Sequence, residues 1–183
     1  MSSQPILETE RLILRPFQLN DAETTQTLAG DKQIAATTLT IPHPYEDGMA
    51  ETWINTHQET YNQGKGVTYA ITLKETNELA GAISLMRIDE NHQAELGYWV
   101  GVPYWNKGYC TEAGKAILEY GFETRELNRI HACYINRNPA SGRVLEKLGM
   151  SHEGTRRQHV QKWGVYEDLD LKGILRSDWE NQR

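Results

Sequence analysis

The order of the expected elements predicts an α+β fold built around a mixed α/β sheet. Apolar periodicity and turn residues predict one strand, two helices, three strands, a helix, a strand, a helix and two final strands. This grouping disfavours a doubly wound parallel sheet, in which strands and helices alternate strictly. The chain has 183 residues, and no repeat or Gly/Ser-rich linker divides it. We therefore expect a single domain over residues 7–180.

The elements are recognised from their end signals and their periodicity. Leu12–Arg15 is predicted as the opening strand, closed by Pro16. Asn20 and Asp21 are expected to cap a helix that runs to about Gly30, because their side-chain oxygens can accept bonds from its free N–H groups. The later elements are expected as a helix, three strands, a helix, a strand, a helix and two strands, over residues 47–62, 67–73, 79–88, 94–100, 108–124, 129–135, 139–148, 151–159 and 165–175.

Composition narrows the class of protein. With 38% hydrophobic and 24% charged residues, the chain is typical of a globular domain and not of a disordered or fibrous protein. Apolar stretches such as Leu96–Val102 are too short to span a membrane. A net charge of −6 disfavours nucleic-acid binding, which needs a basic stripe. Cys110 and Cys133 are too few for a disulfide framework, so we expect a cytoplasmic protein. The short apolar stretches and the net charge lead us to expect no membrane and no nucleic-acid partner.

The segment between the strand that ends at Val100 and the next helix carries an anion-binding signal. The first turn of a helix has free N–H groups and partial positive charge. Gly108 lacks a β-carbon and lets a ligand approach the backbone, while Lys107 adds a charge and Thr111 a hydroxyl donor. This pattern favours a pyrophosphate-binding loop. A tight connection without a ligand is the alternative, and no P-loop or dinucleotide-binding glycine motif is present.

A second polar signal lies at the start of the following helix. Asn138 is expected as its cap and Pro139 as its first residue. Ser141 lies on the same turn, so both polar side chains can face one ligand. The alternative is a well-capped helix that binds nothing.

Residues 96–112 and 136–150 resemble the acyl-CoA-binding motifs of the GNAT acetyltransferase superfamily, and most closely its ribosomal-protein N-terminal acetyltransferase (Rim-type) branch. Glu8–Arg15 resembles the opening strand of that branch, Tyr104–Ala113 its pyrophosphate loop, and Asn138–Met150 its Asn-x-x-Ser helix. The resemblance implies a GNAT domain over residues 7–180. Its fold would be a central mixed, mostly antiparallel seven-stranded sheet, splayed between strands 4 and 5 and flanked by helices.

The resemblance also implies an activity and a site. The chain is expected to transfer an acetyl group from acetyl-CoA to a primary amine, with a protein or peptide N-terminus as the favoured acceptor, by direct attack in a ternary complex and without a metal. Glu95 is the expected base, and Ser141 the expected proton donor to the leaving sulfur. The residues expected to bind the cofactor are Tyr98, Trp99, Val100, Trp105, Asn106, Lys107, Gly108, Tyr109, Cys110, Thr111, Asn138 and Ser141.

Departures from the family pattern leave several alternatives open. Leu145 stands where many relatives have the tyrosine that protonates the thiolate, and Asn106 stands where glycine is usual. A polyamine, amino acid or antibiotic remains open as the acceptor, as does a non-catalytic acyl-CoA sensor, and a homodimer is also left open. A helix N-terminus can lower the pKa of Cys110, but a small residue packed beneath the cofactor is the favoured interpretation. His131 and Cys133 are expected to face the core and not a metal.

Overall fold

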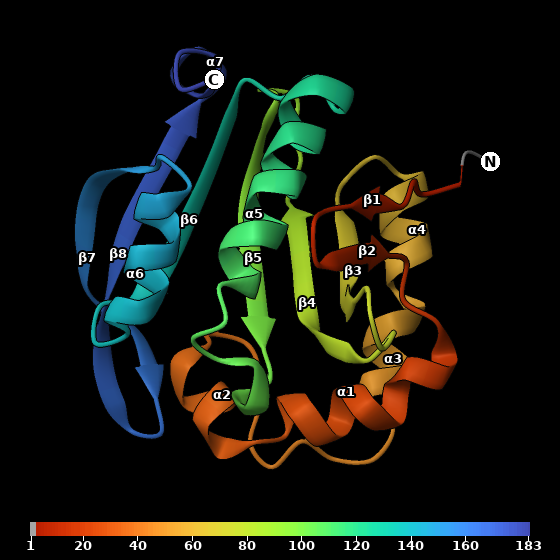
Figure 1. The fold of residues 1–183 in the computed structure, drawn as a ribbon. Helices are drawn as coiled ribbons and strands as arrows, with labels where there is room; N and C mark the ends of the chain where they lie inside the picture. The colour runs from red at the N-terminus through yellow and green to blue at the C-terminus, as the bar shows by residue number, and fades with distance from the viewer. Residues whose placement is uncertain (1–2) are drawn as a thin grey trace.

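The computed structural model describes residues 3–183, which form an eight-stranded sheet with helices on both faces (Figure 1). The strands lie in the order β1-β2-β3-β4-β5-β6-β8-β7, and each neighbouring pair is antiparallel except β5 and β6. Their bounds are β1 (Leu7–Glu8), β2 (Leu12–Arg15), β3 (Val67–Leu73), β4 (Leu79–Met86), β5 (Gln93–Val100), β6 (Arg129–Ile135), β7 (Ser151–Lys162) and β8 (Val165–Leu175). The predicted α+β fold is confirmed, with the two-residue β1 added to the seven expected strands.

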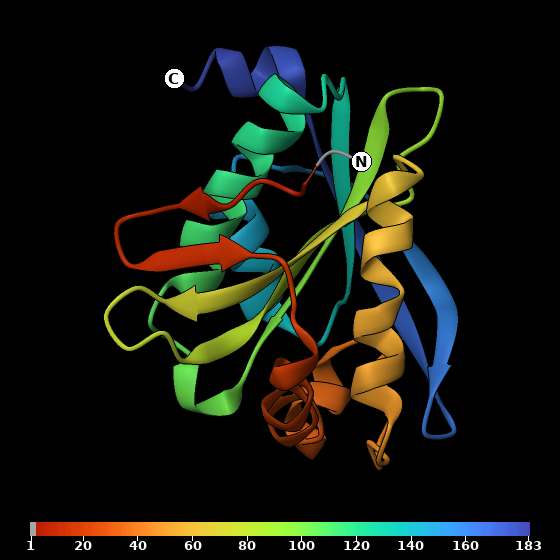
Figure 2. The same ribbon diagram turned by 90° about the vertical axis from the view of Figure 1, so that its right-hand side faces the viewer.

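The α-helices, apart from the last one, form three groups around the sheet. Their bounds are α1 (Ala22–Ala29), α2 (Lys32–Thr37), α3 (Met49–Asn55), α4 (His57–Asn62), α5 (Tyr109–Glu119), α6 (Pro139–Lys147) and α7 (Arg176–Glu180). α5 and α6 lie on one face of the sheet and α3 and α4 on the other, while α1 and α2 close one end (Figures 1 and 2). The first turns of α5 and α6 both lie at the end that α2 covers, so their free N–H groups converge there (Figure 1).

The sheet opens between β5 and β6. These two parallel strands pair only over residues 93–95 and 129–131, although β5 continues to Val100 and β6 to Ile135. β5 stays bonded to β4 as far as Val100, and β6 stays bonded to β8 as far as Ile135. The gap therefore lies between the fourth and fifth of the seven expected strands, where the splay was predicted.

The prediction of a single helix over residues 47–62 is wrong, because the structure has two helices there, α3 and α4, which are separated at Thr56. The Thr56 hydroxyl donates to the backbone oxygen of Trp53 at 2.7 Å, and its N–H donates to the same oxygen at 3.1 Å. Such a local bond from a threonine side chain competes with the regular helical ladder.

The caps near the N-terminus also differ from prediction. Asp21 precedes α1, but its carboxylate accepts the N–H of Gln18 at 2.8 Å and pairs with Arg15 at 2.7 Å, so it does not cap α1. Asn20 lies in a 3₁₀ turn. The short helices α2 and α7 were not expected, although Asp31 caps α2 in the way that a sequence motif could have shown.

The main core lies between the sheet and α5. Its fully buried side chains include Ile83, Leu85, Ile117, Phe122 and Ile130. This packing fixes the direction of α5 against β4 and β5, and so places the start of α5 beside the gap. Across residues 3–183, no helix combines the length and apolar character needed to cross a membrane.

Candidate active site

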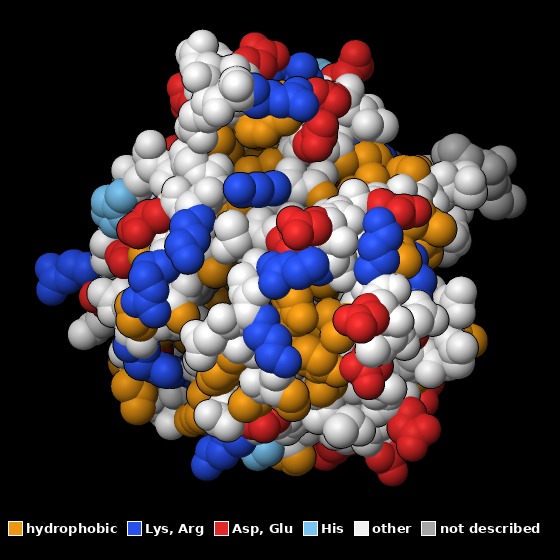
Figure 3. Space-filling model, viewed as in Figure 1, with side chains coloured by type: hydrophobic (Ala, Val, Ile, Leu, Met, Phe, Trp, Pro, Cys, Tyr) orange, Lys and Arg blue, Asp and Glu red, His pale blue; other side chains and the backbone are white. Residues whose placement is uncertain are grey.

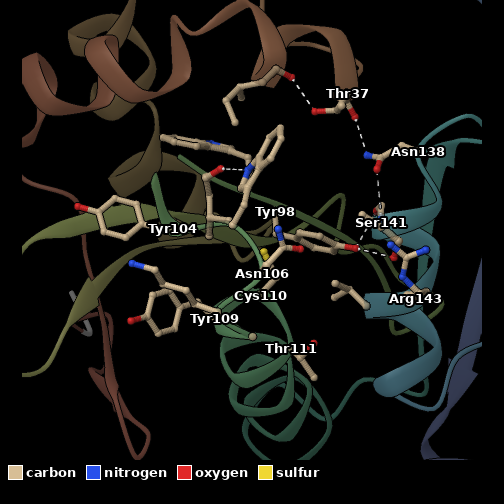
Figure 4. Close-up of a pocket in the computed structure, with 18 of the residues that line it drawn as sticks. Thr37, Tyr98, Tyr104, Asn106, Tyr109, Cys110, Thr111, Asn138, Ser141 and Arg143 are labelled. Carbon is tan, nitrogen blue, oxygen red and sulfur yellow. Dashed lines mark hydrogen bonds between the residues drawn. The ribbon is translucent and has the colours of Figure 1, made fainter. Parts of the chain in front are cut away.

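A cavity of about 570 Å³ lies where β5, the start of α5, the start of α6 and α2 meet (Figure 4). This volume suits a small-molecule or cofactor ligand. The structure brings all twelve of the predicted cofactor-binding residues to its wall: Tyr98, Trp99, Val100, Trp105, Asn106, Lys107, Gly108, Tyr109, Cys110, Thr111, Asn138 and Ser141. Residues that are distant in sequence therefore share one site.

The loop between β5 and α5 is shaped by two residues in the left-handed region. Asn106 has a φ of 61° and Gly108 a φ of 80°, and Gly108 directly precedes the first turn of α5. Asparagine tolerates this conformation better than most residues, which explains how it replaces the usual glycine. The indole N–H of Trp105 donates to the backbone oxygen of Val100 at 2.9 Å and ties the loop to the end of β5. The free N–H groups at the start of α5 are consequently held at the cavity wall.

The cavity wall has one sign of charge. Its charged residues are Lys107, Arg143 and Lys147, with no carboxylate among the lining residues, although the chain as a whole has a net charge of −6. Figure 3 shows Lys and Arg side chains beside apolar ones over the region of α5 and α6. Together with the helix N-terminus, this charge favours an anionic ligand with an apolar portion.

Tyr98, Ser141 and Asn138 connect β5, α6 and α2 across the cavity (Figure 4). The oxygen of the Tyr98 hydroxyl lies 2.8 Å from Ser141 Oγ and 3.1 Å from the Ser141 backbone oxygen. Asn138 accepts the Ser141 N–H at 3.3 Å, as expected for the cap of α6, and donates to the backbone oxygen of Thr37 at 3.3 Å. Burial raises the pKa of Tyr98, against the opposing effect of its bond to Ser141, so the phenol is protonated at neutral pH.

Glu95 lies outside the cavity wall, at the last paired position before β5 and β6 separate. Side chains alternate along a strand, so Glu95 points to the face of the sheet opposite Tyr98. Its side chain is only 12% exposed; one carboxylate oxygen pairs with Arg87, and the other accepts the Cys133 thiol at 3.3 Å. The structure therefore places the two expected catalytic residues, Glu95 and Ser141, on opposite sides of β5.

The pKa values of both cysteine thiols are raised, so both thiols are protonated at neutral pH. Burial raises the pKa of the Cys110 thiol to about 12, which outweighs any lowering by the start of α5. The pKa of Cys133 rises to about 11, first through burial and then through the neighbouring charge of Glu95. His131 is also partly buried, and its pKa is lowered by that burial. Within residues 3–183, no group of three or more His, Cys, Asp or Glu side chains could hold a metal ion.

Several cavity residues were not among those expected from the sequence to bind the cofactor. They are Ile34, Thr37 and Thr38 from the α2 region, Tyr104 from the loop, and Ala140, Arg143, Val144 and Lys147 from α6. Arg143 and Lys147 are four residues apart on one helix, so they share a face, and this spacing was a usable signal. The α2 residues carry no such signal, because only the tertiary fold brings them to the cavity.

The sheet opens between β5 and β6 beside a cavity whose charged lining residues are all basic. Residues 11–151 match the family model described as "Acetyltransferase (GNAT) domain", so the chain belongs to this family and is an N-acetyltransferase that uses acetyl-CoA.

Individual relatives agree with this family. The chain is 31% identical to the "Uncharacterized N-acetyltransferase YoaA" of Bacillus subtilis over 94% of this chain and 97% of that protein. It is 28% identical to the "[Ribosomal protein uS5]-alanine N-acetyltransferase" of Escherichia coli, over 66% of this chain and 63% of that one. A GNAT-family acetyltransferase from Bacillus anthracis superimposes with a TM-score of 0.83 at 28% identity, covering 94% of this chain and 99% of the other.

Proposed function

We propose that the chain acetylates the N-terminal amino group of a protein or peptide, and that acetyl-CoA binds in the cavity at the start of α5. The observation that carries the donor site is the purely basic charge of that cavity wall, next to free helix N–H groups. The acceptor class is supported by similarity to the Escherichia coli enzyme, whose name specifies an alanine of ribosomal protein uS5.

The residues around the cavity fit the chemical parts of acetyl-CoA. The N–H groups of Lys107–Thr111 are suited to the diphosphate, with Arg143 and Lys147 supplying further positive charge from α6. The edge of β5 beyond Glu95 has no β6 partner, so its peptide groups are free to bond the amides of the pantetheine arm. The apolar and aromatic lining, which includes Tyr104 and Tyr109, is suited to the uncharged portions.

Each catalytic step is assigned to groups of the chain. Acetyl-CoA supplies the thioester carbonyl that the amine attacks. Glu95 would take a proton from the amine, directly or through water, and a backbone N–H of Tyr98–Val100 would stabilise the oxyanion. One such donor contributes about 3–4 kcal/mol in other enzymes. As the C–S bond breaks, Ser141 would donate its hydroxyl hydrogen to the leaving sulfur, and a proton from solvent would replace it on Ser141. Leu145 is 0% exposed in the main core, does not line the cavity and has no proton to donate, so the donor has to come from another residue.

The position of Glu95 favours a ternary complex with two entrances. A base on the face opposite Tyr98 would meet the acceptor amine from the side of α3 and α4, whereas the donor cavity is lined by the starts of α5 and α6. Holding both substrates at the gap would itself contribute to the rate, because it replaces a bimolecular encounter. With both cysteine thiols protonated, a covalent acetyl-enzyme is disfavoured.

The test is a thiol-release assay with acetyl-CoA and a panel of acceptors. The panel contains peptides with free and blocked N-termini, a polyamine and free amino acids, and mass spectrometry locates the added acetyl group. We expect release with free N-terminal peptides, and modification of the α-amine. Release with only the polyamine or amino acids would assign a small-molecule acceptor. Binding of acetyl-CoA without amine-dependent release would instead support a sensor.

A further inference from the structure

Glu112 is an acidic residue in the first turn of α5, next to the loop that is proposed to bind the diphosphate. Its carboxylate is bonded by the turn between β1 and β2. Oε1 accepts the Thr9 hydroxyl at 2.6 Å and the Arg11 N–H at 2.7 Å, while Oε2 accepts the Arg11 Nε and pairs with Arg11 Nη2, both at 2.7 Å. Neither Glu112 nor Arg11 lines the cavity.

The charge of Glu112 has to be compensated for an anion to bind nearby. Burial tends to raise the pKa of Glu112, but the bonds from Thr9 and Arg11 lower it below its usual value, so the carboxylate is ionised. An ionised carboxylate at this end of α5 would repel a diphosphate. The paired guanidinium of Arg11 cancels that charge on the side away from the cavity.

Arg11 also reaches the loop itself. Its Nη1 donates to the backbone oxygen of Lys107 at 3.0 Å, and its guanidinium carbon lies 4.9 Å from the centre of the Tyr109 ring. A β-carbon built on Gly108 would lie 3.5 Å from Arg11 Nη2, so the guanidinium lies directly behind the loop. In a planar trans peptide the carbonyl and the following N–H point in opposite directions. Holding the Lys107 oxygen toward Arg11 therefore turns the Gly108 N–H toward the cavity.

We propose that Arg11 is a positioning residue for diphosphate binding: it orients the Gly108 N–H through the Lys107 carbonyl and neutralises Glu112, without contacting the ligand. This inference rests on the proposed donor site. It assigns a role in the cofactor site to the turn between β1 and β2, which lies outside the cavity wall.

The experiment compares two thioester donors. Acetyl-CoA carries the diphosphate, whereas S-acetyl-pantetheine lacks it but presents the same thioester. For Arg11→Met we expect the KM for acetyl-CoA to rise about tenfold, as for the loss of a hydrogen bond between charged groups. We expect unchanged kcat with acetyl-CoA, and unchanged kinetics with S-acetyl-pantetheine. Arg11→Lys keeps the charge but cannot bond Glu112 and the Lys107 oxygen together, so its KM should lie between those of the parent and Arg11→Met.

Two further variants separate charge from fold. Arg11→Met combined with Glu112→Gln should recover part of the affinity for acetyl-CoA, because the uncompensated charge is gone. Lys74→Met is the matched control, because Lys74 pairs with Glu8 at 2.9 Å and bonds the backbone oxygen of Thr9 without touching the loop; its kinetics should match the parent.

Equal losses with both donors, or no change with either, would overturn the proposal. If the parent chain released no thiol with any amine, the proposed function would fail. Calorimetric titration with CoA and with pantetheine would still test Arg11, because only CoA affinity should then fall in Arg11→Met.

Discussion

The hydroxyl oxygen of Tyr98 on β5 lies 2.8 Å from Ser141 Oγ on α6, and 3.1 Å from the backbone oxygen of the same serine. A phenol has one proton to donate, so when Tyr98 donates to the backbone oxygen, the Ser141 hydroxyl is free to donate to Tyr98 or to a ligand. The pair therefore holds a hydroxyl donor at the wall of the cavity, in a chain whose Leu145 is buried away from it.

Removal of that donor should slow the chemical step. Ser141→Ala is expected to lower kcat about 100-fold, in the lower range for general acid catalysis. The KM for acetyl-CoA should change less than kcat, because the loop and the start of α5 are untouched although Ser141 lines the cavity. Tyr98→Phe keeps the ring but loses the bond that orients Ser141, so its kcat should fall less than that of Ser141→Ala. An unchanged kcat in Ser141→Ala would exclude this serine as the proton donor.

Glu95→Gln should reduce turnover about 100-fold or more at neutral pH, where the acceptor amine is protonated and needs a base. The loss should narrow as the pH rises, because the amine then loses its proton to solvent. Acetyl-CoA affinity, measured by titration calorimetry, should stay intact because Glu95 does not line the donor cavity. Glu153→Gln is the matched control, since Glu153 pairs with Arg129 on the adjacent strand β6. Parallel pH profiles for Glu95→Gln and the parent would rule out Glu95 as the base.

The loop conformation leads to a paired prediction. Gly108 has a φ of 80°, which costs a residue with a β-carbon about 1–2 kcal/mol, so Gly108→Val should weaken acetyl-CoA binding about tenfold or more. Asn106→Gly should keep the affinity for acetyl-CoA, because glycine adopts the φ of 61° at this position without strain. Dissociation constants from calorimetry check both variants. Normal affinity in Gly108→Val would show that the donor binds elsewhere.

The sequence was informative where the site is local. Gly108, Lys107 and Thr111 lie within five residues of one another between a strand end and a helix start, so their grouping on one wall could be predicted without tertiary structure. Asn138 was recognised for the same reason, because a cap followed by proline is a local signal.

The remaining wall depends on long-range contacts that periodicity does not encode. Thr37 and Thr38 reach the cavity because Asn138 and Lys162 bond their backbone oxygens, at 3.3 and 2.6 Å, from segments more than 100 residues away. The gap between β5 and β6 was likewise predicted from the family resemblance and not from periodicity, because neither strand alone shows that its pairing stops at Glu95. The acceptor preference is also difficult to predict from the sequence, because it depends on such long-range contacts.

A last prediction concerns stability in acid. His57 packs edge-on against Trp53 and Phe17, with ring centroids 4.4 and 5.4 Å away, and neither ring nitrogen has a hydrogen-bond partner in the described part of the chain. Burial lowers its pKa from 6.5 to about 4. Between these two values the unfolded chain binds a proton that the folded chain does not, so this histidine makes stability fall as the pH drops from 6.5 toward 4.

Replacement of His57 by an apolar ring should remove that dependence. Between pH 7 and pH 4, the melting temperature of His57→Phe is expected to fall less than that of the parent. The melting temperature of His159→Phe, a change at an exposed histidine, should fall as much as that of the parent. Burial tends to raise the pKa of Asp21, but its bonds from Arg15 and Gln18 lower it overall, so this carboxylate also makes every variant less stable in acid. The readout is therefore the difference between the melting curves and not their absolute fall. Identical slopes for His57→Phe and the parent would show that the imidazole is protonated in the folded chain, which requires a partner or water at its ring nitrogens.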